Sequence, residues 1–319
     1  MLEKETSAGE AYFLGIDGGG TKTDCFLVDS HGAVLSQATA GPSNPLRAGY
    51  AKAWFTLSDA ADLVLERQHL KSSDIRGICA GIGGAGRANV AKRIATFLER
   101  GFPEAAVSVT SDLEITLQAA VGDAEGIILV VGTGSAAYGR DAEGHVARAG
   151  GRGPWFSDEG SGFDIGRRAL AAVVRADEKR GPATALAARM LAFLQCRDWS
   201  QVVDSVVKNP DDVFPRIFPL VAELGDEGDV VCREILSSAA QSLVDLAGSV
   251  IEKLGMQNRE VPIAKAGGTL GRSKFFDAAI EQGLHRVAPR ARIISLQMKP
   301  AEAAAKIAIR LGKRKAHAG

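Results

Sequence analysis

The stretch from Tyr12 to Asp29, YFLGIDGGGTKTDCFLVD, decides how this chain folds. Its first part, Tyr12–Asp17, predicts a buried strand that runs into a turn rich in glycine at residues 18–21. Residues 23–29 predict a second strand, and a third follows at residues 33–39 after another tight turn. The sequence therefore opens with three consecutive strands, of which the first two are joined by a glycine turn.

The same pattern recurs in the middle of the chain. Residues 127–131 (IILVV) run into Gly132-Thr133-Gly134-Ser135, and strands at 136–140 and 145–149 follow. A single hydrophobic core rarely exceeds about 300 residues, so a chain of 319 residues also favours two domains. We assign residues 1–122 to an N-terminal domain and 123–300 to a C-terminal domain with a helical insertion, and expect that the helix at 301–319 can return to the first.

Helical and strand patterns alternate along most of the chain. Apolar residues recur at helical spacing in 50–69 and 88–99, and strands are predicted at 76–81 and 106–109. After the second set of three strands the chain becomes largely helical before a strand at 261–266. This alternation predicts an α/β protein whose mixed sheets are flanked by helices.

Composition excludes several classes of protein. Lys and Arg number 38, as do Asp and Glu, so no overall charge favours nucleic acid or an anionic membrane. The polar first residues lack the apolar run of a signal peptide. Five scattered histidines give no support for a metal cluster or for Ser/His/Asp catalysis, and the four cysteines are far apart. A cytoplasmic protein is expected.

The glycine turns are suited to binding phosphate. Glycine lets backbone N–H groups approach an anion closely, because no Cβ intervenes. The spacing of a Walker A loop is absent from these turns, and a Rossmann turn would open a helix rather than a second strand. Two matched turns and a third glycine loop at 267–268 favour a polyphosphate ligand over three plain turns.

These motifs resemble those of the actin, sugar kinase and heat-shock ATPase superfamily. Ile16–Thr23 is similar to its first phosphate motif, residues 132–135 to its second, and residues 266–269 to its adenosine motif. Within it the chain resembles the BadF/BadG/BcrA/BcrD ATPase group, which includes N-acetylglucosamine and glucosamine kinases; residues 157–162 (SDEGSG) carry most of that distinction. The resemblance implies a two-domain actin-like, ribonuclease H-like ATPase fold with mixed five-stranded sheets and a nucleotide in the interdomain cleft.

The resemblance also implies ATP and Mg²⁺ as cofactors. Asp17, at the end of the first strand, is the expected metal ligand, although it could instead cap its own turn. The residues expected to bind the nucleotide lie in the three glycine loops: Gly18, Gly19, Gly20, Thr21, Lys22, Thr133, Gly134, Ser135, Gly267, Gly268 and Thr269.

Asp112 is the expected catalytic base and also a substrate contact. It follows a strand and opens a helix, where the helix N-terminus favours the ionised carboxylate. Taken alone, Asp112 would more often be a helix N-cap, and it is the resemblance to sugar kinases that favours the catalytic role. The remaining residues expected to bind the sugar have plain alternatives as turns or caps: Asn44, Gly84, Gly151, Asp158 and Ser161.

The function implied is an ATP-dependent kinase that phosphorylates an amino sugar, N-acetylglucosamine or glucosamine, with O6 as the expected hydroxyl. The partner is then a small sugar rather than nucleic acid or a membrane, and a homodimer is left open. The alternative is an ATPase that activates a 2-hydroxyacyl-CoA dehydratase or benzoyl-CoA reductase. Such activators hold an iron–sulfur cluster with paired cysteines, whereas Cys25 and Cys79 fall within predicted core strands.

Overall fold

The computed structural model describes residues 11–318, which form two compact units. The first comprises the described residues up to Asp123 and those from Leu296 onward, and the second comprises Ala124–Ser295. Residues 296–300, which the sequence analysis gave to the second domain, group with the first unit, where Gln297 N donates to Ala119 O (3.0 Å). No helix within the described residues is long and apolar enough to cross a membrane.

The first unit is built on a five-stranded sheet of order β3-β2-β1-β4-β5. The first three strands are antiparallel neighbours, while β4 and β5 run parallel to β1. The strands are β1 (Tyr12–Gly18), β2 (Thr23–Val28), β3 (Val34–Ala40), β4 (Ile75–Ile82) and β5 (Ala106–Thr110). The helices are α1 (Pro45–Ala48), α2 (Tyr50–Glu66), α3 (Ala88–Gly101), α4 (Asp112–Val121) and α11 (Pro300–Ala318), with a 3₁₀ turn at Ser72–Asp74.

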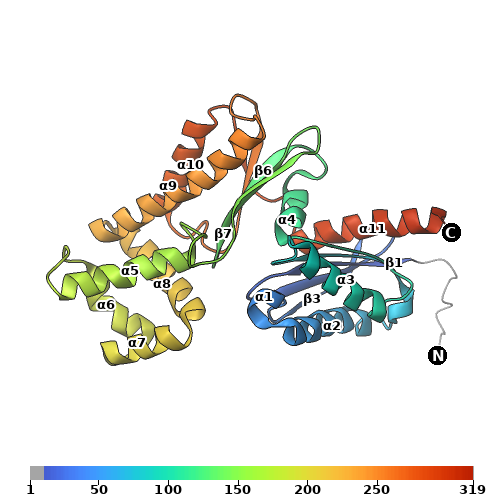
Figure 1. The fold of residues 1–319 in the computed structure, drawn as a ribbon, viewed down its shortest axis with the longest axis horizontal. Coiled ribbons are helices and arrows are strands. Elements are labelled where there is room, and N and C mark those ends of the chain that lie inside the picture. The colour runs from blue at the N-terminus through green and yellow to red at the C-terminus, as the bar shows by residue number, and fades with distance from the viewer. Residues whose placement is uncertain (1–10, 319) are drawn as a thin grey trace. The chain divides into compact units, whose positions relative to one another are not determined.

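Side chains of β1 alternate between the two faces of this sheet. Leu14 and Ile16 belong to the core under α2 and α3, whereas Phe13 packs on the opposite face among the alanines of α11. Figure 1 shows α11, the red helix at the C-terminal end, lying along the blue and teal elements of this unit. The period of two in the first strand therefore gives the sheet two buried faces.

The helix α11 lies unusually close to the sheet because its contact residues are small. A Cβ on Gly15 would lie 2.0 Å from Ala301 O, and one on Gly77 would lie 2.3 Å from Ala308 O. Only glycine fits where the helix backbone approaches the strands this closely. Glycines inside two core strands are thus explained by packing, not by turns.

The second unit repeats this plan. Its sheet has the order β10-β9-β6-β7-β8, in which β6, β7 and β8 are antiparallel and β9 and β10 run parallel to β6. Its strands are β6 (Gly126–Val131), β7 (Ser135–Arg140), β8 (Val146–Gly150), β9 (Pro262–Ala266) and β10 (Arg292–Ile294). Its helices are α5 (Gly162–Asp177), α6 (Ala185–Leu194), α7 (Trp199–Lys208), α8 (Pro210–Glu227), α9 (Val230–Lys253) and α10 (Lys274–Val287). The predicted α/β architecture with two mixed five-stranded sheets is confirmed.

A glycine-to-alanine pair tests the close packing of α11. We expect Gly15→Ala to lower the free energy of unfolding by about 3 kcal/mol or more, because its methyl group meets helix backbone that cannot move aside. Gly101→Ala is the control: nothing lies within 4 Å of its Cβ position at the end of α3, so we expect a change within about 1 kcal/mol. Urea unfolding measures both, and equal effects of the two substitutions would contradict this account.

Candidate functional site

The turn between β1 and β2 is held from two sides by backbone hydrogen bonds. Within the turn, Gly19 N donates to Lys22 O (2.9 Å). Gly83 N, just beyond β4, donates to Gly18 O (2.7 Å). The turn is therefore fixed to the next parallel strand of the sheet.

The segment before α1 is attached to the same turn. Ser43 N and Asn44 N both donate to Gly19 O, at 3.1 and 3.0 Å. A Cβ on Gly18 would lie 2.2 Å from Ser43 Oγ, so glycine is needed there for this close approach. Asn44, expected from composition to lie in a simple turn, instead caps the one-turn helix α1 by accepting from Leu46 N (3.0 Å).

Three segments far apart in the sequence meet at Gly83. Asn44 Nδ2 lies 3.0 Å and Asp112 Oδ2 lies 3.4 Å from the position that a Cβ on Gly83 would take. The neighbouring Gly84 has φ of +89° and lies against Asn44 and Leu46. The structure thus brings Asn44, Gly84 and Asp112 together, with an amide and a carboxylate beside backbone that carries no side chain.

Asp112 is the first residue of α4 and is not its N-cap. Ser111 caps the helix, because its Oγ accepts from Glu114 N (3.2 Å). Asp112 uses Oδ1 to accept from Leu113 N (3.0 Å), while Oδ2 is the atom near Gly83. Asp112 is therefore not the N-cap of α4, because the neighbouring Ser111 has that role.

Asp17 lies at the end of β1 in a concentration of negative charge. The pKa of its carboxyl group is raised to about 7, mainly by burial and in addition by the negative charges of Asp112 and Asp24, while Lys22 lowers it by a smaller amount. Lys22 is mostly exposed and pairs with Asp24 (2.6 Å). A half-buried carboxylate with a second and a third carboxylate nearby is suited to bind a hard cation such as Mg²⁺, so these residues fit the metal that the resemblance implies.

In the second unit, two glycine loops lie side by side. Gly132 N donates to Gly134 O (2.9 Å), and Thr269 Oγ1 donates to Val131 O (2.7 Å). Gly267 has φ of +110°, and a Cβ there would lie 2.2 Å from Val131 O. The loop at 267–269 is therefore packed against the strand that leads into the turn at 132–135, as one binding surface of backbone groups would require.

Asp158 is buried against the turn that follows β6. Its side chain is 5% exposed, and Oδ2 lies 2.8 Å from the Cβ position of Gly134. Its backbone has φ of +65°, and its Oδ1 accepts from Gly153 N (3.4 Å). The residue expected to bind sugar is thus in contact with the second glycine turn.

Ser161 and Gly151 lie in the same loop region as Asp158. Ser161 is fully buried and caps α5, with its Oγ accepting from Asp164 N (3.3 Å). Gly151 has φ of +68°, and its carbonyl accepts from Arg148. Asp164 in turn accepts from Gly160 N (3.0 Å) and pairs with Arg168 (2.7 Å), which fixes the loop before the helix.

Arg47 was missed by the sequence analysis. On the structure its Nη1 lies 3.1 Å and its Cδ 3.2 Å from the Cβ position of Gly20 in the first turn. The pair Asn44-Pro45 is typical of an N-cap followed by proline at the first helical position, so the sequence carried a signal for α1. This signal predicts the helix but not its position. The position of Arg47 near the glycine turn follows only from the hydrogen bonds of Ser43 and Asn44 to Gly19 O.

The buried cysteines are poor cluster ligands. Cys25 and Cys79 are fully buried, and burial raises the pKa of each thiol to about 12. Thiolate is the form that binds metal, so these two groups are in the wrong protonation state as well as inaccessible. This geometry agrees with the argument from sequence against an iron–sulfur activator.

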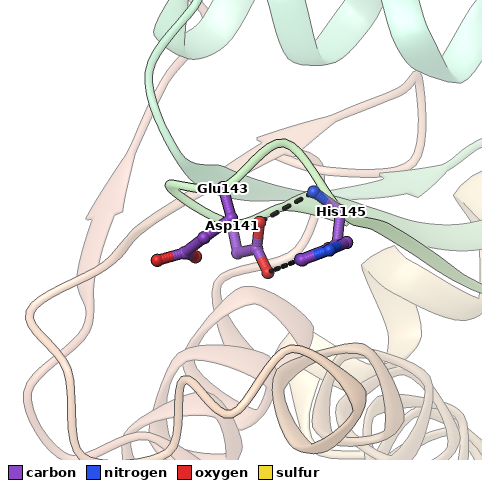
Figure 2. Close-up of side chains that lie close together, drawn as sticks. All are labelled: Asp141, Glu143 and His145. Carbon is purple, nitrogen blue, oxygen red and sulfur yellow. Dashed lines mark hydrogen bonds and ion pairs between the residues drawn. The ribbon is translucent and has the colours of Figure 1, made fainter.

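One exposed group of possible metal ligands lies on the hairpin between β7 and β8, among the residues described. Figure 2 shows Asp141, Glu143 and His145, whose ligand atoms all lie within 4.8 Å of one another. Asp141 accepts from His145 N (2.8 Å), and its Oδ2 lies 3.0 Å from His145 Nδ1. These bonds close the turn and account for the grouping without an ion.

Comparison with known proteins gives a consistent result over most of the chain. A model of the BadF/BadG/BcrA/BcrD ATPase family matches residues 14–308. The N-acetylmuramic acid/N-acetylglucosamine kinase of Clostridium acetobutylicum is 31% identical over 288 residues, which cover 90% of this chain and 94% of the relative. The N-acetyl-D-glucosamine kinase of Dictyostelium discoideum is 30% identical, covering 93% and 97%.

Solved structures support the same fold. A protein of Chromobacterium violaceum assigned as an N-acetylglucosamine kinase superposes with a TM-score of 0.76 at 26% identity, covering 94% of this chain and 98% of that one. A ROK family glucokinase of Streptomyces griseus, in complex with glucose and AMPPNP, gives 0.63 at 15% identity over 94% and 99%. At 15% identity, the similarity to the glucokinase shows only that the two proteins share a fold.

The raised pKa of Asp17 predicts a stability that depends on pH. A carboxyl group whose pKa is about 7 in the folded and about 3.8 in the unfolded protein contributes stability that is fully present below pH 3.8 and is lost progressively as the pH rises from there through about 7. We expect Asp17→Asn to raise the melting temperature at pH 8 by several degrees more than at pH 5, because the two pH values differ by about 2–3 kcal/mol in the cost of ionising Asp17.

Thermal unfolding in EDTA, which removes divalent cations, measures this difference. Asp204→Asn, on the exposed side of α7, is the control and should shift the melting temperature equally at both pH values. An equal shift for Asp17→Asn at pH 5 and pH 8 would contradict the prediction.

Proposed function

This chain belongs to the BadF/BadG/BcrA/BcrD ATPase family, and we propose that it is a kinase that transfers phosphate from ATP to O6 of an amino sugar. The names of its relatives support an acceptor of the N-acetylglucosamine type. We propose that this kinase acts in the cytoplasm on a small sugar and binds neither nucleic acid nor a membrane. Its oligomeric state is that of a monomer or a homodimer.

The observation that carries this proposal is the meeting of Asn44 and Asp112 at Gly83. An amide and a carboxylate there can bind neighbouring hydroxyl groups of a sugar, since the amide both donates and accepts and the carboxylate accepts. Gly83 is buried, whereas Gly84 is partly exposed and carries no side chain that would keep a ligand from its backbone. The hydrogen bond from Gly83 N to Gly18 O ties this cluster to the first glycine turn.

In the proposed reaction Asp112 is the base that receives the proton of the attacking hydroxyl. The hydroxyl oxygen forms a bond to the γ-phosphorus, the bond from that phosphorus to the β–γ bridging oxygen breaks, and ADP leaves with the electron pair. Asn44 orients the sugar so that the hydroxyl points to Asp112. Mg²⁺, for which Asp17 is the proposed ligand, would neutralise charge on the phosphates when bound.

The glycine loops are proposed to bind the nucleotide. In the first unit these are residues 18–22, and in the second they are residues 133–135 and 267–269. Each loop contains backbone amides, and Thr21 and Thr133 add hydroxyl groups to the first two loops; these are good donors to phosphate oxygens. The hydroxyl of Thr269 instead donates to Val131 O (2.7 Å) and holds the third loop in place. In the second unit Asp158, Ser161 and Gly151 are proposed to contact the sugar, and the two units are proposed as the two domains of the enzyme.

A panel of acceptors tests the proposed function. We expect ADP release from Mg-ATP to rise at least about tenfold above the level without sugar when N-acetylglucosamine or glucosamine is added. Glucose, N-acetylmannosamine and N-acetylmuramic acid complete the panel, and mass spectrometry and NMR identify the phosphorylated oxygen. A flat response to every sugar would count against a kinase, and a phosphate on another oxygen would overturn the O6 assignment.

Substitution of the proposed base gives a second prediction. Asp112→Asn keeps the size of the side chain and cannot accept the proton, so we expect kcat to fall by about 10²- to 10⁴-fold. The melting temperature should stay within a few degrees, because Ser111 still caps α4. Glu114→Gln on the same helix is the control, and retention of a tenth of wild-type kcat by Asp112→Asn would remove Asp112 from the role of base.

A further inference from the structure

Arg47 is held beside the first glycine turn by the backbone. Its helix, α1, begins directly after Asn44, whose N–H and that of Ser43 both donate to Gly19 O. Two hydrogen bonds to one carbonyl fix where α1 lies relative to the turn. Arg47 is therefore placed by the fold, although its side chain is exposed.

The side chain of Arg47 lies across Gly20. Its Cδ is 3.2 Å, its Nη1 3.1 Å and its Cζ 3.9 Å from the position of a Cβ at residue 20. A larger residue at position 20 would displace the guanidinium group. Glycine at this position thus leaves the turn open to phosphate and also leaves room for a cation over it.

The position of Arg47 places a positive charge in a region of negative charge. The carboxylates of Asp24 and Asp112 both interact electrostatically with that of Asp17 near the turn, and Lys22 forms an ion pair with Asp24. A triphosphate would bring further negative charge to the same place. A guanidinium group binds phosphate oxygens through two parallel N–H bonds and stays charged at every physiological pH, so it suits this position better than an amine.

We propose that Arg47 is a catalytic residue that binds the oxygens of the transferred phosphoryl group. This inference rests on the proposed kinase function and names a residue of that same site. Arg47 follows Asn44 by three residues, and Asn44 lies with Asp112 at the proposed acceptor site. Its guanidinium therefore contacts the phosphate nearest the acceptor, the γ-phosphate, and stabilises the charge on its oxygens as the bond to ADP breaks.

The test compares Arg47→Ala and Arg47→Lys with the wild-type protein. We expect Arg47→Ala to lower kcat by about 10²-fold or more, with the Kd of the sugar changed less than about threefold. Arg47→Lys should recover only part of the loss, since lysine keeps the charge and not the planar geometry. Millimolar guanidinium should restore part of the activity of Arg47→Ala.

Calorimetry with two nucleotides separates this role from a structural one. Arg47→Ala should bind AMPPNP about tenfold more weakly and ADP within about threefold of wild type, because only the triphosphate analogue carries the γ-group. Arg100→Ala, at the exposed end of α3, is the matched control and should change neither value. Equal losses of ADP and AMPPNP affinity, or a kcat of Arg47→Ala within threefold of wild type, would overturn the proposal.

The nucleotide measurement also keeps the two hypotheses apart. If the wild-type protein phosphorylates no sugar, the kinase proposal fails, and the AMPPNP measurement still decides whether Arg47 recognises the γ-phosphate. If the wild-type protein is an active kinase and Arg47→Ala matches it, only the inference about Arg47 fails.

Discussion

The carbonyl groups of Gly18 and Gly19 hold the functional part of the first unit together. Gly18 O accepts from Gly83 N, and Gly19 O accepts from both Ser43 N and Asn44 N. These three hydrogen bonds join the turn after β1 to the segment before α1 and to the end of β4. Because a buried backbone amide without a partner is costly, they fix segments that are about 25 and 65 residues away along the chain. The meeting of Asn44 and Asp112 at Gly83 depends on this arrangement.

Glycine contributes to this protein in two distinct ways. In β1 and β4, Gly15 and Gly77 allow the backbone of α11 to lie almost directly on the sheet. In the turns, the absence of a side chain leaves room for a neighbouring polar or charged group. Gly18 does so for Ser43, Gly20 for Arg47, and Gly134 for Asp158. The first role stabilises the fold, and the second places polar and charged groups where a ligand would meet backbone amides. A glycine count alone does not separate these roles.

The two units share one strand order but differ in what surrounds the glycine turn. In the first unit the turn is surrounded by carboxylates, and the pKa of Asp17 is raised to about 7. In the second unit the turn at 132–135 contacts the buried carboxylate of Asp158 and the loop that begins at Gly267. This difference in charge supports the proposal that a metal ion and a base belong to the first unit and that the second binds phosphate through backbone groups. Under this proposal the two units share one strand order but have different roles in binding and catalysis.

The sequence by itself determined the architecture, because strand and turn patterns are local. Alternation of apolar residues, the two glycine turns and the helical periodicity between them predicted an α/β protein with mixed sheets, and the resemblance of the glycine motifs and of residues 157–162 to those of known ATPases indicated the family. It also singled out Asp17, Asn44 and Asp112. Only the tertiary structure decided that Ser111 and not Asp112 caps α4, and that Asn44 begins a helix tied to Gly19. It also decided that Arg47 lies over Gly20. Those facts depend on contacts between segments far apart along the chain, and hydrophobic periodicity carries no information about which backbone groups will meet.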